Sequence, residues 1–231
     1  MIIGVTDSGI GGLHLLASLI KNKCGDRYLY LSDGANLPYG NKDRETLREI
    51  ALRSAKVLTE EGANVLVYGC NTLSVTTLDY VRKRVTPPVF GLIPRPELLS
   101  GKGVLMTTPT TARYLPGIPG NVTVIAPSEL ASMIDTDYPD PRRIKRYLTP
   151  LLRPYGECES LYLGCSHYLY AKEILRSLLP RARMLDGVDP LAALVHAVLP
   201  QISCKNPCVR FLFTGEDQSK RYASILSALL E

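Results

Sequence analysis

The sequence lacks a long apolar run and a secretion signal. No segment approaches the roughly 18 consecutive apolar residues that a membrane-spanning helix requires. The N-terminal segment 1–7 is apolar, but no basic residues precede it and it reaches Asp7 too early for a signal peptide. We therefore expect a cytoplasmic protein that does not enter a membrane.

The patterns typical of cofactor and metal sites are also missing. The turn 7–12 is rich in glycine, but it has neither the Rossmann spacing nor the Gly-Lys-Ser/Thr of a P-loop. Cys204 and Cys208 have the spacing of half a zinc site, yet no second pair with histidines accompanies them. In a cytosolic chain of this size the six cysteines are expected to be free thiols. We expect neither a metal ion nor a cofactor.

A strong excess of charge of one sign is absent as well. Lysine and arginine number 27 against 22 aspartate and glutamate residues, and the densest basic cluster, 142–146, is typical of the solvated face of a helix. Nucleic acid is therefore not an expected partner. The 231 residues are 45% hydrophobic and 21% charged, which is ordinary for a globular protein with one large domain or two small ones.

Strand and helix patterns alternate along the chain, which predicts an α/β fold with mostly parallel sheets flanked by helices. The prolines at 94 and 96 interrupt this alternation and indicate a hinge into a second lobe. The C-terminal segment is too short for a third lobe, so it is expected to pack on the first. The predicted domains are 1–93 plus 187–231 as the first α/β lobe and 94–186 as the second, related by pseudo-symmetry.

Two segments, 65–72 and 161–168, share one pattern. Each is an apolar run that stops at Gly-Cys and is followed by small polar residues, as expected for a buried strand that carries a cysteine to the rim of a sheet. Asp7 precedes Cys70 by 63 residues, and Thr108 precedes Cys165 by 57, which suggests a duplicated unit. One buried cysteine is normally a small apolar residue, but two at matched strand ends favour a chemical role.

Ligands of open parallel sheets bind beyond the carboxyl ends of the strands, so the active site is expected in the cleft between the two lobes. Hydroxyl, amide and backbone N–H groups there suit the carboxylates and ammonium of an amino acid. One cysteine from each lobe would lie on opposite faces of a bound amino acid. This arrangement suits inversion of a stereocentre, in which one group removes a proton and the other returns one. Thiols serve this purpose if their pKa is lowered, with Asp7 placed to help Cys70 and His167 to help Cys165.

These motifs resemble the cofactor-independent aspartate/glutamate racemase superfamily, and within it the glutamate racemases. The resemblance is carried, in the family's order, by the segments 5–13, 33–40, 70–72, 108–111 and 163–168. It implies racemisation of L-glutamate to D-glutamate, which supplies peptidoglycan synthesis, by an enzyme that is expected to form a homodimer. Ser166 stands where the family usually has threonine, and an acidic residue of the family is matched loosely by Asp135.

The resemblance also assigns roles to residues. Cys70 and Cys165 would be the catalytic acid/base thiols, assisted by Asp7 and His167. The implied substrate-binding residues are Asp7, Ser8, Tyr39, Gly40, Asn71, Thr72, Thr108, Thr111, Ser166 and His167.

Three alternatives stay open at this point. The motifs are also compatible with a racemase whose substrate is aspartate or another amino acid. A cysteine-nucleophile hydrolase or transferase would use Cys165 with His167, but it would leave Cys70 without a role. A non-catalytic binding protein of the same fold would keep the ligand contacts, with little reason to keep both thiols.

Overall fold

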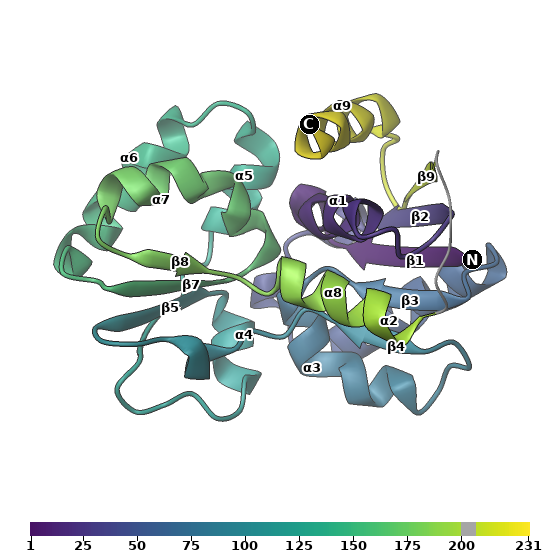
Figure 1. Ribbon diagram of the computed structural model, residues 1–231, viewed down its shortest axis with the longest axis horizontal. Coiled ribbons are helices and arrows are strands. Elements are labelled where there is room, and N and C mark those ends of the chain that lie inside the picture. Colours follow the sequence, from purple (N-terminus) through teal and green to yellow (C-terminus); the bar gives the residue numbers. More distant parts are fainter. Residues whose placement is uncertain (200–206) are drawn as a thin grey trace.

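The strands form two separate parallel sheets in the computed structural model, which describes residues 1–199 and 207–231 (Figure 1). The first sheet has the order β4-β3-β1-β2-β9 and the second β6-β5-β7-β8. The strands are β1 (Ile2–Asp7), β2 (Arg27–Ser32), β3 (Val65–Tyr68), β4 (Val89–Gly91), β5 (Gly103–Thr107), β6 (Thr123–Ile125), β7 (Ser160–Gly164), β8 (Arg183–Leu185) and β9 (Cys208–Phe213). We call each sheet with its helices a lobe.

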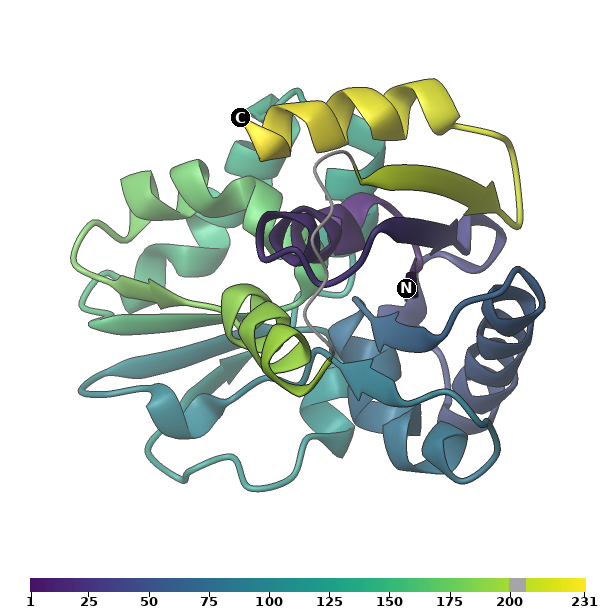
Figure 2. The ribbon, with the colours of Figure 1, turned by 45° about the vertical axis from the view of Figure 1, so that its right-hand side comes forward.

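Helices flank both sheets, as Figures 1 and 2 show. Those of the first lobe are α1 (Leu13–Lys21), α2 (Arg44–Glu60), α3 (Asn71–Arg82), α8 (Val188–Val198) and α9 (Ser219–Leu230). Those of the second lobe are α4 (Pro109–Tyr114), α5 (Leu130–Asp137), α6 (Arg142–Leu152) and α7 (Lys172–Leu178). Two short 3₁₀ segments, η1 (Ile10–Gly12) and η6 (Ser166–Ala171), lie against each other where the lobes meet.

The two sheets repeat one topology. The order β2-β1-β3-β4 in the first lobe matches β6-β5-β7-β8 in the second, strand for strand. Cys70 and Cys165 therefore follow equivalent strands, β3 and β7, as their shared sequence pattern predicted. The α/β fold with two pseudo-symmetric lobes is confirmed, whereas the residue boundaries assigned to the two domains remain a prediction.

The C-terminal segment completes the first sheet. Strand β9 pairs in parallel with β2, in a register that runs from Arg27 opposite Cys208 to Ser32 opposite Phe213. The expected packing of this segment on the first lobe is thus correct. The pairing covers the outer edge of β2, an edge that would otherwise expose unpaired backbone groups.

Local sequence signals explain most helix starts. Asp43 is the N-cap of α2, because its carboxylate accepts a hydrogen bond from the Thr46 N–H at 2.9 Å. Helix α4 begins within the hydroxyl-rich segment 107–111. Thr108 caps this helix by accepting a hydrogen bond from the Thr111 N–H, and Pro109 occupies the first turn, a combination that favours a helix start.

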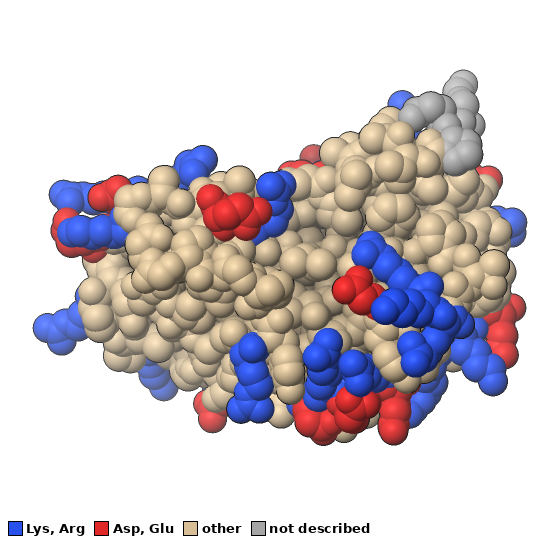
Figure 3. All heavy atoms as spheres, turned by 90° about the horizontal axis from the view of Figure 1, so that it is seen from below, with Lys and Arg blue, Asp and Glu red and all other residues tan. Residues whose placement is uncertain are grey.

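The structure also shows the state of the cysteines and the distribution of charged side chains. Cys24, Cys70, Cys158, Cys165 and Cys208 are free thiols, and Cys204 lies outside the described residues. Within 1–199 and 207–231, no group of histidine, cysteine and acidic side chains is arranged to hold a metal ion, and no helix is long and apolar enough to cross a bilayer. On the face drawn in Figure 3, basic and acidic side chains are interspersed.

The packing of α2 on the first sheet gives a test of the core. Leu58 is fully buried against Gly4, which carries no side chain to fill a void. We expect Leu58→Ala to lower the free energy of unfolding by about 2–5 kcal/mol. The matched control is Leu194→Ala, because Leu194 is 51% exposed, and its effect should stay within about 0.5 kcal/mol. Urea unfolding measures both, and equal losses would contradict this account of the core.

Candidate active site

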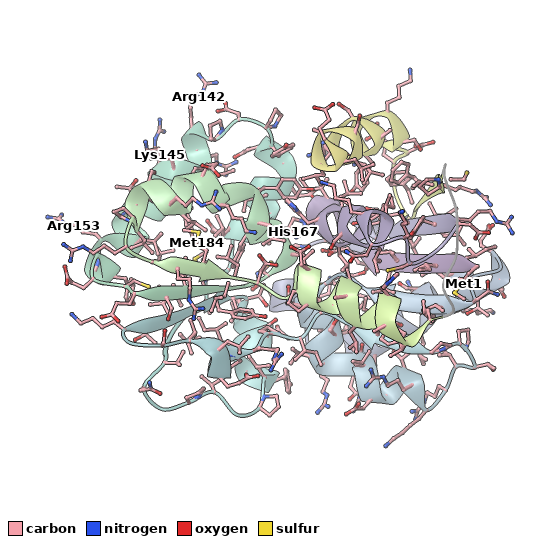
Figure 4. All side chains as sticks on the ribbon, in the orientation of Figure 1. Met1, Arg142, Lys145, Arg153, His167 and Met184 are labelled. Atoms are coloured by element: carbon pink, nitrogen blue, oxygen red, sulfur yellow. The ribbon has the colours of Figure 1, made fainter. Side chains whose placement is uncertain are left out.

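The predicted site residues lie together where the strand ends of the two lobes meet. All twelve are buried, namely Asp7, Ser8, Tyr39, Gly40, Cys70, Asn71, Thr72, Thr108, Thr111, Cys165, Ser166 and His167. Figure 4 shows His167 at the boundary between the lobes. The lobes are closed on each other here, so that side chains of the site form hydrogen bonds from one lobe to the other.

Asp7, at the end of β1, connects the first lobe to the second by a hydrogen bond. Its Oδ1 accepts hydrogen bonds from the backbone N–H groups of Ser8 (2.6 Å) and Gly9 (3.4 Å). Its Oδ2 accepts one from the Ser166 hydroxyl of the second lobe at 2.9 Å. Burial raises the pKa of Asp7, although the charge of His167 and these hydrogen bonds act in the opposite direction.

Cys70 is the N-cap residue of α3, so the strand predicted to reach it ends two residues earlier, at Tyr68. Backbone N–H groups at the start of α3 favour the thiolate. Burial and the negative charge of Asp7 outweigh them, and the pKa of Cys70 stands well above its ordinary value. The condition of a lowered thiol pKa is therefore not met at Cys70 while the lobes are closed.

Cys165 has a different environment, dominated by His167. The imidazole forms hydrogen bonds with Cys165 and with Asp135 of α5, the latter at 3.2 Å between Nε2 and Oδ1. Burial lowers the pKa of His167, but these two hydrogen bonds and the charges of Asp7 and Asp135 prevail and raise it well above its usual value. These neighbours favour the imidazolium form of His167 beside Cys165.

Asp135 joins the lobes as well. Its Oδ1 accepts a hydrogen bond of 2.8 Å from the backbone N–H of Ile10 in η1. Burial acts to raise the pKa of Asp135, but the hydrogen bond and charge of His167 outweigh it, and the pKa is lowered overall. The structure brings Asp135 into direct contact with His167, a contact that the loose sequence match did not establish.

Three threonine hydroxyls form a closed cluster across the lobes. The Oγ1 atom of Thr72 lies 2.8 Å from that of Thr108 and 3.1 Å from that of Thr111, and the last two are 2.9 Å apart. Beside them, a Cβ atom added to Gly40 would lie 2.8 Å from the Cβ of Thr108. The loop with Gly40 therefore packs directly on the second lobe, at a distance that only glycine allows.

Two polar side chains of the site have further roles in the structure. The Tyr39 hydroxyl donates a hydrogen bond to Asp33 at 2.7 Å, so Asp33 orients this loop, a role that the sequence reading did not assign. The Asn71 amide donates to the carbonyl of Leu92, while its Oδ1 is buried without a hydrogen-bond partner among the residues that the structure describes. A buried acceptor in this state is able to receive a hydrogen bond from a ligand.

Proteins of known family resemble this chain along most of its length. No family model matches the chain. A glutamate racemase of Leptospira borgpetersenii is 32% identical, over 80% of this chain and 77% of that protein. A glutamate racemase of Pseudomonas syringae pv. tomato is 31% identical, and the match covers 98% of this chain and 90% of the relative.

The chain belongs to the glutamate racemase family. The family predicted from the sequence motifs, and with it the isomerase class, is thereby confirmed. The crystal structure of the glutamate racemase from Francisella tularensis in complex with D-glutamate superposes with a TM-score of 0.80 at 25% identity. The match covers 99% of this chain and 92% of that one, so the fold is that of glutamate racemases from end to end.

The close approach of Gly40 to Thr108 gives a test of the closed site. In Gly40→Ala the new methyl group would overlap the Thr108 side chain and push the lobes apart. We expect alkylation of the buried Cys70 and Cys165 to become roughly tenfold faster, since overpacking costs about 1–3 kcal/mol. Peptide mass spectrometry after timed alkylation measures the rates.

Gly34→Ala is the matched control for this loop, because a Cβ at Gly34 would meet no atom within 4 Å. Its alkylation rates should equal those of the unmodified protein. Identical rates in both variants would show that the Gly40 contact does not keep the site closed.

Proposed function

We propose that this chain interconverts L- and D-glutamate without a cofactor, with Cys70 and Cys165 as the two acid/base thiols. The observation that carries the proposal is the equivalence of the two cysteines. They follow the matching strands β3 and β7 of two sheets with one topology and are buried in the same lobe interface. Two thiols that approach a bound molecule from opposite lobes suit removal and return of a proton on opposite faces.

The polar groups around the thiols suit an acidic amino acid. The threonine cluster of Thr72, Thr108 and Thr111 offers hydroxyl donors for a carboxylate, and its three hydroxyl groups lie within hydrogen-bond distance of one another. The unpartnered Oδ1 of Asn71 and the carboxylate of Asp7 are acceptors for an ammonium group. The relative from Francisella tularensis was crystallised with D-glutamate, which favours glutamate here too.

The proton transfer that we propose needs one thiolate and one thiol. The thiolate removes the α-proton, the opposite thiol donates its proton to the other face of the carbanion, and the two sulfur atoms exchange protonation states. Burial raises the pKa of Asp7, which makes its carboxylate a better proton acceptor, and its negative charge acts on Cys70, so that Asp7 is suited to exchange a proton with this thiol. His167, which is hydrogen-bonded to Cys165, is the corresponding helper in the second lobe.

The wider role follows from the family resemblance. We infer that the product D-glutamate serves peptidoglycan synthesis in the cytoplasm and that the enzyme acts as a homodimer, the default for symmetric assemblies. Gel filtration with light scattering would determine the oligomeric state.

Deuterium exchange tests the two-thiol reaction. Incubated in D2O without added cofactor, the protein should convert L-glutamate to α-deuterated D-glutamate. We expect Cys70→Ser and Cys165→Ser each to lose activity by about 10²- to 10⁴-fold, the usual contribution of a positioned acid or base. Cys208→Ser is the control, since Cys208 is an exposed free thiol on β9 and should not be needed. NMR and optical rotation follow the reaction.

Several outcomes would reject this proposal. Absence of exchange with glutamate would exclude the proposed substrate, and a parallel reaction with aspartate would then identify the alternative substrate. Loss of activity in only one of the two site variants would point to a single catalytic cysteine, as in a nucleophilic hydrolase.

The unequal surroundings of the thiols predict unequal isotope effects. Enantiomers have equal free energy in water, so kcat/KM must be the same in both directions for every variant. We therefore expect Asp7→Asn to raise the primary deuterium isotope effect for one α-deuterated enantiomer, and His167→Gln for the other, since each helper assists a different cysteine. Isotope effects that rise for the same enantiomer in both variants would contradict the assignment of one helper to each thiol.

A further inference from the structure

We propose that Arg221 of the C-terminal helix α9 is a positioning residue for the Asp135–His167 pair. This inference rests on the proposed function, because the pair supports Cys165 in that reaction. Arg221 belongs to the first lobe by sequence and topology, whereas Asp135 and His167 belong to the second. No motif of the sequence pointed to Arg221.

The contact is made at the end of a helix. The Nη2 atom of Arg221 donates a hydrogen bond to the backbone carbonyl of Asp135, and its Nη1 donates one to Gln218 at 2.8 Å. Helix α5 ends at Asp137, so the carbonyl of Asp135 is among the last four, which have no partner within the helix. A guanidinium there satisfies the carbonyl and offsets the negative end of the helix dipole.

Asp135 is thereby held at two points by the first lobe. Arg221 binds its backbone, and the N–H of Ile10 binds its carboxylate, which also contacts His167. The fit is close, because a Cβ atom on Gly9 would lie 2.1 Å from the Asp135 Oδ1. A shift of α5 would therefore move the carboxylate relative to both Ile10 and His167.

The residue next to Arg221 fixes α9 on the first lobe. The Tyr222 hydroxyl lies 2.8 Å from the Ser32 hydroxyl, and its ring packs against Tyr30 and Phe213. Tyr30 in turn donates a hydrogen bond to the carbonyl of Gly9 at 2.7 Å. Adjacent residues of one helix thus support both sides of the site. Tyr222 packs on Tyr30, which holds the loop after Asp7, and Arg221 binds the backbone of Asp135.

The positive charge of Arg221 also acts on the Asp135 carboxylate. The carboxylate of Asp135 lies in the last turn of α5, where the helix dipole disfavours a negative charge, and Arg221 and His167 are the cations that lower its pKa. The titratable and charged groups around the pair are Tyr170 of η6, Cys165 before it, Asp7 of β1, His14 of α1, Tyr30 of β2, Arg221 and Tyr222 of α9, and Asp137 on α5 itself. Loss of the Arg221 charge should raise the pKa of Asp135.

Histidine NMR tests this without any substrate. The chain has three histidines, so selective ¹⁵N labelling gives three rings, and the spectrum of His167→Gln identifies the signal of His167. Because the ring shares a hydrogen bond with Asp135, its shifts should show an inflection at acid pH when Asp135 takes up a proton. We expect Arg221→Gln to move that inflection upward by about half a pH unit, the size of a helix-end charge effect.

Two further variants make the result specific. Arg221→Lys keeps the charge and should leave the inflection close to that of the unmodified protein. Lys220→Gln removes an exposed charge from the same helix and should leave it unchanged. An inflection that does not move in Arg221→Gln, or that moves equally in Lys220→Gln, would overturn the proposal.

Kinetics with glutamate give the second readout. A small displacement of Asp135 and His167 should lower kcat/KM by roughly 10- to 100-fold in Arg221→Gln and much less in Arg221→Lys. If the unmodified protein does not racemise glutamate, the proposed function fails, and the NMR titration still decides the role of Arg221. If racemisation stands and the inflection does not move, only the role of Arg221 is rejected.

Discussion

Charged groups buried between the lobes are the constraint on which this structure depends. Asp7, Asp135 and His167 lie in one interface, and burying a charge without partners costs several kcal/mol. Each group obtains partners from the opposite lobe, as in the hydrogen bonds from Ser166 to Asp7 and from Ile10 to Asp135. The charges are therefore satisfied only when the two sheets direct their carboxyl ends at each other, which the repeated topology makes possible.

The backbone of the two lobes is nearly symmetric, but the chemistry placed on it is not. Cys70 has a carboxylate neighbour and a raised pKa, whereas Cys165 has an imidazolium neighbour. A racemase must handle two mirror-image substrates with one set of L-amino acids, so equal surroundings for the two thiols are not required. In the proposed reaction, what each thiol needs is a neighbour that can accept its proton or compensate its charge.

Much of this architecture was predictable because it is local in sequence. The Gly-Cys pattern after two apolar runs predicted the two strand ends that Cys70 and Cys165 follow. The start of helix α4 is also marked locally, by Thr108 followed by Pro109. The raised pKa of Cys70 could not be predicted from the sequence, because burial depends on tertiary structure. Arg221 was invisible for the same reason, since its partner Asp135 lies 86 positions away.

The place of β9 in the first sheet has a consequence for synthesis of the chain. Its neighbour β2 spans residues 27–32, yet β9 spans 208–213, and the entire second sheet is made between them. During translation the second lobe is therefore complete before the first, and the edge of β2 stays open until the last strand and α9 emerge. Because α9 carries both Tyr222 and Arg221, the segment that follows β9 also brings the contacts with Ser32 and with the carbonyl of Asp135.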